Sequence, residues 1–274
     1  MPTEADTCRK LIVPKLQGAG WDNEPYSIAE QRTITDGRIV PVGKSFIRRP
    51  PKRVDYILRY RRDFPLAVVE AKPEYKTAAD GLQQAKQYAE MLGLKFAYAT
   101  NGAETIEFDY FTGKETKIES YPTPEALWQR FREGESLTSD TAAQQLLTPI
   151  NFTLRQGERY YQEIAINRAV EAIVTGKPRI LLTMATGTGK TPVAFQICWK
   201  LWNARWNRTG EHRRPKILYL SDRNILIDGS KGQNLCPIRR RPRKDREWQR
   251  NQKPRDLLRD LPSARKRRAS PGLV

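Results

Sequence analysis

The chain has 274 residues and a mass of 31.6 kDa, enough for one large domain or two modest ones. Mean hydropathy is −0.70 and the sequence holds no run of about 18 apolar residues, so no membrane-spanning helix is expected. Three widely spaced cysteines and a single histidine exclude a disulfide framework and a zinc site. These features fit a cytoplasmic protein that does not contact a membrane.

The first part of the chain alternates between helix and strand patterns. A helix is predicted over 5–18, where Pro14 bends or shortens it. Turns are predicted at Asp36-Gly37 and Asn101-Gly102. Further elements follow in order: strands over 26–34, 54–60 and 66–71, a helix over 77–92, strands over 95–100 and 104–111, and a helix over 124–131. This alternation predicts an α/β domain over residues 1–132.

The second part begins after a stretch with little apolar content, 133–157, which we interpret as a linker. A helix is predicted over 158–175, a buried strand over 180–185, a helix over 192–206 and a second buried strand over 217–222. A strand, helix and strand joined in this way imply parallel pairing, and hence a parallel α/β lobe that starts at 158 and ends at 228.

The net charge of +18 is distributed unevenly. Residues 231–274 hold 15 Lys and Arg against four Asp and Glu, whereas residues 1–230 hold 34 against 27. Apolar periodicity also stops after Asp228. Clustered like charges with few apolar partners cannot offset the ordering entropy, so residues 229–274 are predicted to be a disordered basic tail.

The sharpest motif is MATGTGKT at 184–191, between a predicted strand and a predicted helix. Such a loop turns successive backbone N–H groups toward phosphate oxygens, which assigns this role to Thr186, Gly187, Thr188 and Gly189. Lys190 would meet the outer phosphates, and the Thr191 hydroxyl would be a Mg²⁺ ligand. The alternative is a glycine-rich turn that binds nothing.

Two further observations concern nucleotide use. Gln162 precedes the loop by about 25 residues, and its amide could read an adenine edge beside Tyr160 and Tyr161; the alternative is an exposed helix residue. The sequence contains no Asp-Glu dipeptide, the acidic motif that a phosphate-loop motor needs for Mg²⁺ and the attacking water. We therefore expect this chain to bind ATP weakly or not at all, with negligible turnover and no coupled translocation.

A second constellation joins Asp55 to Glu70 and Lys72. Two carboxylates are hard oxygen ligands for Mg²⁺, and a lysine can orient or deprotonate a water, so the set fits phosphodiester cleavage at a polar edge of the sheet. Glu30 is a candidate accessory metal ligand. A solvated charge cluster is the alternative, but a basic approach flanks the set, as a DNA backbone requires: Arg48, Arg49, Lys52, Arg53, Arg59, Arg61 and Arg62.

These motifs together resemble the R subunit of type I restriction-modification enzymes. The resemblance covers residues 1–228 and rests on TDGR at 35–38, DYIL at 55–58, VEAK at 69–72, QAKQY at 84–88, the phosphate loop and LSDRNILID at 220–228. It implies a PD-(D/E)xK nuclease domain followed by a superfamily 2, RecA-like motor lobe, here cut short.

By the same resemblance, Asp55, Glu70 and Lys72 would be the nuclease centre, and Gln84 and Tyr88 would assist it.

The resemblance also implies Mg²⁺ and ATP as cofactors, double-stranded DNA as substrate, and methyltransferase and specificity subunits as partners. Two other interpretations stay open: a remnant that binds DNA or nucleotide without catalysis, and a stand-alone nuclease with a vestigial phosphate loop.

For the basic tail we predict an out-of-frame product. A one-base shift of plausible codons for residues 232–237 gives the sequence Ala-Lys-Thr-Phe-Ala-Pro, which resembles the stretch expected here in this family. Its rival is a basic DNA-binding arm.

Overall fold

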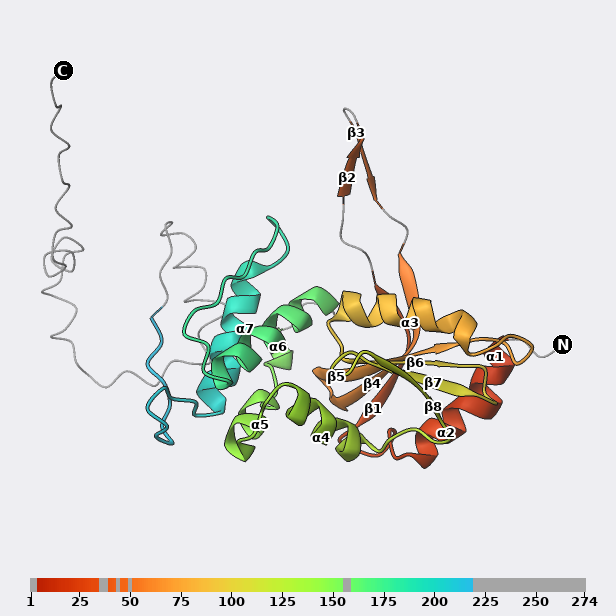
Figure 1. Ribbon diagram of the computed structural model, residues 1–274. Helices are drawn as coiled ribbons and strands as arrows, with labels where there is room; N and C mark the ends of the chain where they lie inside the picture. Colours follow the sequence, from red (N-terminus) through yellow and green to blue (C-terminus); the bar gives the residue numbers. More distant parts are fainter. Residues whose placement is uncertain (1–3, 35–38, 43–44, 49–50, 155–158, 219–274) are drawn as a thin grey trace, which may run out of the picture. The chain divides into compact units, whose positions relative to one another are not determined.

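The computed structural model describes residues 4–34, 39–42, 45–48, 51–154 and 159–218 (Figure 1). The predicted turn at Asp36-Gly37, the chain beyond residue 218 and the basic tail lie outside the described residues. Contacts divide the chain into two units, Met1–Leu235 and Cys236–Val274, and all that follows concerns the first. No helix in the described ranges is both long and apolar enough to cross a bilayer.

A six-stranded sheet with the order β1-β4-β5-β6-β7-β8 organises the first half of the chain. Its strands are β1 (Ser27–Ile34), β4 (Lys52–Arg61), β5 (Phe64–Ala71), β6 (Phe96–Thr100), β7 (Thr105–Asp109) and β8 (Lys114–Ile118). Only β5 and β6 pair in parallel, joined by the crossover helix α3 (Ala79–Leu92). β2 (Ile39–Val42) and β3 (Ser45–Arg48) form a separate antiparallel hairpin between β1 and β4.

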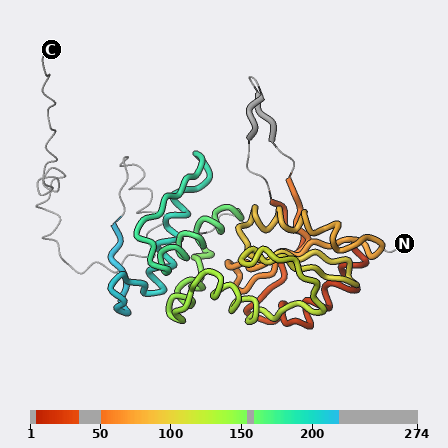
Figure 2. The backbone as a smooth tube through the Cα atoms, in the orientation of Figure 1, coloured from red at the N-terminus to blue at the C-terminus, as the bar shows by residue number. Residues whose placement is uncertain are grey.

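Helices cover the sheet on both faces, so β5 at its centre is apolar almost throughout. α3 packs on one face through Leu82, Ala85 and Leu92, against β-strand residues that include Val68 and Ala97. The N-terminal helices and α4 (Pro124–Gly134) cover the other face, as the tube in Figure 2 shows. The predicted strands over 26–34, 54–60, 66–71, 95–100 and 104–111 and the helices over 77–92 and 124–131 are confirmed, with boundary shifts of a few residues.

The predicted helix over 5–18 is confirmed, but its helix type changes along the chain. It consists of α1 (Glu4–Thr7), one turn of π-helix (Cys8–Ile12) and α2 (Val13–Gly18). Pro14 lies in the first turn of α2, directly after the π turn, in which the Val13 N–H donates to the Cys8 carbonyl. The wider π turn lets the chain pass the proline without a sharp bend, so Ile12 and Leu16 both stay buried beneath the sheet.

The segment predicted as a linker, 133–157, is structured over most of its described length, and in this respect the prediction is wrong. It contains α5 (Asp140–Leu146) and a short 3₁₀ turn (Phe152–Leu154). Ser139 begins α5 by accepting a hydrogen bond at its Oγ from the Ala142 N–H. Leu146 and Ile150 are buried in the same core cluster as α4. Few but well-spaced apolar residues were enough to anchor it.

The motor-lobe prediction is met by its helices only. α6 (Tyr160–Val174) and α7 (Lys190–Asn203) form as expected. The predicted buried strand over 180–185 is wrong, because these residues are irregular and Ile180, Leu181 and Leu182 are 41%, 88% and 40% exposed. In the described part of the second predicted strand, Leu218 is 81% exposed. Among the described residues, neither 180–185 nor 217–218 pairs with another strand, and an isolated pair of strands would be only marginally stable.

Candidate active site and phosphate loop

The register between β4 and β5 brings Asp55 and Glu70 together. Tyr56 pairs with Val69 and Ile57 with Val68, so the same register extended by one residue places Asp55 opposite Glu70. Residues opposite each other in adjacent strands point to the same face, here the face covered by α3. Asp55 is 7% exposed and Glu70 is 3% exposed, so the predicted polar edge is in fact a buried position.

Lys72 completes the predicted triad one residue beyond the end of β5. Its Nζ donates to Oε1 of Glu70 at 2.8 Å and to Oε1 of Gln84 at 3.0 Å. Gln84 in turn donates from Nε2 to the Tyr88 hydroxyl at 2.7 Å. Burial raises the pKa of Tyr88, which keeps its hydroxyl neutral. The structure therefore links Glu70, Lys72, Gln84 and Tyr88 in one chain of hydrogen bonds.

Asp55 is held by two donors, one of which the sequence did not indicate. Its Oδ2 accepts from the Ala71 N–H at 2.8 Å, and its Oδ1 accepts from Nε2 of Gln31 at 3.1 Å. Glu30, the predicted accessory ligand, is exposed and pairs with Tyr56, whose side chain belongs to the core on the opposite face of the sheet. The structure therefore brings Gln31, and not Glu30, to the candidate centre.

Gly81, in the first turn of α3, is a second residue that sequence analysis missed. A Cβ at this position would lie 3.2 Å from Cγ and Cε of Lys72 and 3.4 Å from Cγ of Glu70. Glycine costs helix stability, so its presence in a helical pattern is the signal that could have pointed to a close approach. It lets α3 press directly on the side chains of the triad.

The donor set fits a divalent oxygen-loving cation. Within the described ranges no cluster of three or more His, Cys, Asp or Glu could hold a metal by itself. Mg²⁺, however, is commonly held by one or two carboxylates while water and substrate phosphate fill its remaining positions. Asp55 and Glu70 supply such a pair, with the Lys72 ammonium beside them to offset part of their charge.

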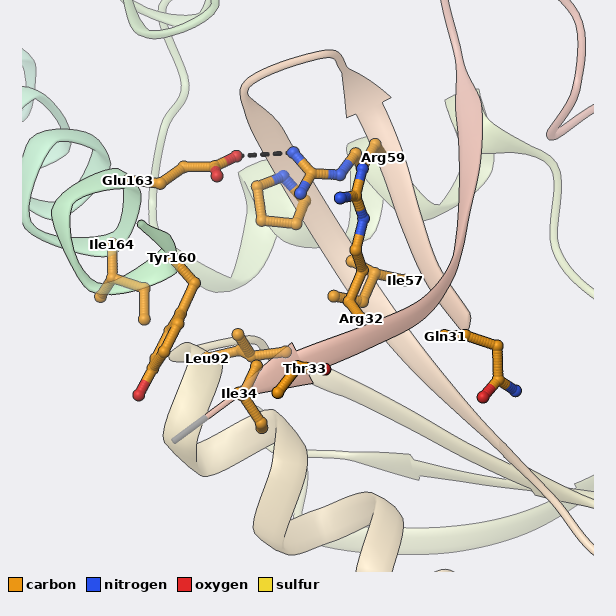
Figure 3. A pocket seen from close by; sticks show the side chains of 11 residues that line it. Gln31, Arg32, Thr33, Ile34, Ile57, Arg59, Leu92, Tyr160, Glu163 and Ile164 are labelled. Atoms are coloured by element: carbon orange, nitrogen blue, oxygen red, sulfur yellow. Dashed lines mark hydrogen bonds and ion pairs between the residues drawn. The ribbon is translucent and has the colours of Figure 1, made fainter. Parts of the chain in front are cut away.

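A pocket of about 310 Å³ lies between the outer edge of the sheet and α6 (Figure 3). Gln31 is at one end, and an ion pair between Arg59 and Glu163 of 2.7 Å lies at the other. Tyr160 and Ile164, one turn apart on α6, extend toward Leu92 and Ile34. The pocket shows that α6 packs on the nuclease-like sheet with one of its faces.

The glycine-rich loop predicted to bind phosphate leads directly into α7. Gly187 and Gly189 have φ of 79° and 89°, values that suit glycine, and Lys190 opens the helix. Thr188 closes the turn by donating from Oγ1 to the Ala185 carbonyl at 2.6 Å. The loop conformation and the helix N-terminus fit a phosphate cradle, although the strand expected to enter it is absent.

Gln162 contacts the phosphate loop directly. Its Nε2 donates to the Thr188 carbonyl at 2.7 Å, and a Cβ on Gly189 would clash with that amide. Tyr160, one of the two aromatic residues that precede Gln162, lines the pocket on the sheet side. α6 thus has one face on the sheet and another on the phosphate loop.

A buried polar cluster ties α6 and α7 to the turn between β4 and β5. Lys200 of α7 is fully buried, 3.6 Å from Asp63 and 3.2 Å from Oδ1 of Asn167. Asp63 also accepts from the Ile150 N–H at 2.9 Å, and its carbonyl accepts from Asn167. Burial lowers the pKa of Lys200, and the negative charge of Asp63 acts in the opposite direction and raises it. We call Asp63, Asn167 and Lys200 the turn cluster.

The described residues thus form a mixed α/β sheet that carries this carboxylate–lysine set, followed by a glycine-rich loop at the start of α7. The model of the family "Type III restriction enzyme, res subunit" matches residues 156–259. Two curated relatives from Escherichia coli are the endonuclease subunits of the type I restriction enzymes EcoAI, 37% identical over 86% of this chain, and EcoKI from strain K12, 34% identical over 61%.

A solved structure described as a fragment of an HsdR subunit of a type I restriction enzyme from Vibrio vulnificus YJ016 is also similar. It is 55% identical, with a TM-score of 0.71 over 78% of this chain and 41% of that one. The chain belongs to the family of R subunits of type I restriction enzymes. It spans 29% of the EcoAI subunit and 14% of the EcoKI subunit.

Proposed function

We propose that this chain carries the Mg²⁺-dependent endonuclease centre of a type I restriction R subunit. The observation that supports it best is the convergence of Asp55, Glu70 and Lys72 from two adjacent strands on the face covered by α3. Gln84 and Tyr88 extend the set from α3. Double-stranded DNA is the proposed substrate, and methyltransferase and specificity subunits are the proposed partners of the whole enzyme.

Asp55 and Glu70 would hold Mg²⁺, which when bound supplies a Lewis acid for the scissile phosphate. Lys72 is positioned by Glu70 and Gln84, so its ammonium can orient the attacking water and offset charge that builds on the phosphate. Gln84 holds the lysine from the helix side, and the neutral Tyr88 hydroxyl accepts from Gln84. The role of Gln84 and Tyr88 is thus to position Lys72.

Basic residues beside the centre suit the DNA backbone. Lys52 donates to Oε1 of Gln87 at 3.1 Å and lies 5.9 Å from the centre of the Tyr88 ring. Lys52 therefore lies beside α3, next to Tyr88 of the proposed site. Phosphate contacts by such residues add affinity that falls with salt, without sequence preference.

For the second half we propose ATP binding at Thr186, Gly187, Thr188, Gly189, Lys190 and Thr191, with Thr191 as the Mg²⁺ ligand. Gln162 supports the site by contacting the loop. Exposure of 180–182 favours weak binding in this chain, because the strand that would brace the loop is not formed. We expect negligible ATP turnover, and a turnover that Lys190→Ala removes would contradict this.

The nuclease proposal is tested with isosteric variants of the full chain. Asp55→Asn and Glu70→Gln should lose Mn²⁺ binding measured by calorimetry, whereas Lys72→Met should keep it. All three should cleave plasmid DNA at least about 100-fold more slowly. Glu74→Gln, an exposed carboxylate two residues past Lys72, is the matched control. Cleavage by any triad variant at the parental rate would contradict the proposal.

A further inference from the structure

We propose that Gln31 is a positioning residue that orients the Asp55 carboxylate for a divalent cation. This inference rests on the proposed nuclease function and extends it to a residue that its motif does not include. Gln31 belongs to the edge strand β1. Its amide donates to Oδ1 of Asp55, whereas Oδ2 accepts from the Ala71 N–H of β5.

The backbone at Gln31 is unusual for a strand. Its φ is 51°, in the left-handed region that residues with a side chain rarely adopt. The β1–β4 ladder pairs Glu30 with Tyr56 and Arg32 with Val54, while Gln31 and Asp55 between them make no such pair. Strain of this kind persists only when its surroundings hold it, and it is concentrated at functional sites.

The distorted backbone accompanies a hydrogen bond from the Gln31 side chain to Asp55. One oxygen of Asp55 is fixed by the Ala71 N–H and the other by the Gln31 amide, so the plane of the carboxylate is set from two sides. Each oxygen keeps a lone pair for a cation. Gln31 is exposed whereas Asp55 is buried, so this contact lies where the carboxylate meets solvent.

The residue type also matters. A carboxylate at position 31 would repel Asp55 and raise the cost of holding two acids in a buried site without metal. A glutamine amide donates a hydrogen bond and adds no charge. The neighbouring Glu30 lies on the same strand but does not reach Asp55, so it offers a matched comparison one residue away.

The test uses the full chain with Gln31→Gly, Gln31→Ala and the control Glu30→Gln. Glycine accepts a positive φ, so Gln31→Gly should unfold at a temperature no lower than the parent. Its Kd for Mn²⁺, measured by calorimetry, should nevertheless rise about 5- to 10-fold, as should that of Gln31→Ala. The Mg²⁺ concentration for half-maximal plasmid cleavage should rise equally, with the maximal rate changed less than about threefold.

If Gln31 had a merely structural role, Gln31→Gly would not keep the unfolding temperature of the parent while its affinity for Mn²⁺ falls. An unchanged Kd in both Gln31 variants, or an equal loss in Glu30→Gln, overturns the inference while leaving the proposed function in place. A parent that neither binds Mn²⁺ nor cleaves DNA overturns the proposed function, and the inference with it.

Discussion

Two short apolar runs, 66–71 and 180–185, look alike in sequence but differ in the structure. The first is the inner part of β5, with β4 and β6 on either side and helices over both faces. The second is irregular, and Leu181 is 88% exposed. An apolar run predicts a buried strand only where neighbouring strands and covering helices exist to bury it, and 180–185 has none among the described residues.

The helices of the two halves are held differently as well. α3 packs on the sheet through apolar side chains. α6 and α7 also place apolar side chains in the core cluster of the sheet, but buried polar links are added to these contacts. The turn cluster and the Arg59–Glu163 pair join the two helices to β4 and its turn, and reciprocal hydrogen bonds join Gln196 of α7 to Asn151, which follows α5. The phosphate-loop helices thus depend on the nuclease-like half for their anchorage, which the first prediction below tests.

The largest expected effect is on the turn cluster. Asp63→Ala should lower the free energy of unfolding by about 3–5 kcal/mol, because it leaves the buried Lys200 ammonium without its counter-charge. Chemical denaturation measures this. The double variant Asp63→Asn, Lys200→Met should recover at least half of the loss. An effect of Asp63→Ala below about 1 kcal/mol would show that the cluster is not a real anchor.

The two apolar runs can be compared with one substitution type. Leu66→Ala should cost about 2–5 kcal/mol of unfolding free energy, since Leu66 is 1% exposed in the sheet core. Leu181→Ala should change it by less than about 0.5 kcal/mol. Equal costs would mean that 180–185 is buried after all, and the contrast between the two halves would disappear.

A pH effect is expected where α6 meets the end of α4. The pKa of Glu171 is raised from its ordinary value of 4.5 to about 7. Burial is the larger cause, and the negative charge of the neighbouring Glu135 is the second. The folded chain then binds more protons than the unfolded chain between these pH values, so this group's contribution to stability falls as pH rises from about 4.5 to 7. Glu171→Gln removes this dependence.

Relative to the parent, Glu171→Gln should therefore be about 1–2 kcal/mol more stable at pH 8 than at pH 4.5, with partial solvent screening included. Denaturation at both pH values measures the difference. The same relative stability at both would mean that Glu171 titrates normally and is not buried against Glu135.

The smallest expected effect on stability accompanies a clear effect on activity. Gly81→Ala should raise the unfolding free energy by at most about 1 kcal/mol through helix propensity. The added Cβ would press on Lys72, so cleavage should fall about tenfold, or about 1.4 kcal/mol in the barrier. A parental cleavage rate would show that Lys72 moves aside freely or that it has no part in the reaction.

Much of the nuclease-like half follows from the sequence. Alternating and apolar runs located five of its strands and α3, and the spacing of Asp55, Glu70 and Lys72 anticipated their meeting. Gln31 and Gly81 could not be found in this way, because one depends on a local backbone distortion and the other on a close helix approach. The burial of Asp55 and Glu70 depends on α3, whose packing no single motif encodes.

The second half was less predictable for a physical reason. Local patterns define α6, α7 and the phosphate loop, but a parallel sheet requires contacts between distant strands. The order of the basic tail, its reading frame and the domain limit at 228 stay predictions, since residues from 219 on lie outside the described ranges. The domain limits at 132 and 157 stay predictions as well. The family match to 156–259 continues past residue 229.

We propose that Asp55, Glu70 and Lys72 form a nuclease centre, and none of the described contacts of these residues involves the phosphate loop. Relaxation of supercoiled plasmid by the purified chain in Mg²⁺, with and without ATP, tests it most directly. We predict nicking at the same rate in both conditions, none in EDTA, and a loss of at least about 100-fold in Lys72→Met. Nicking that survives Lys72→Met, or that requires ATP, would contradict the claim.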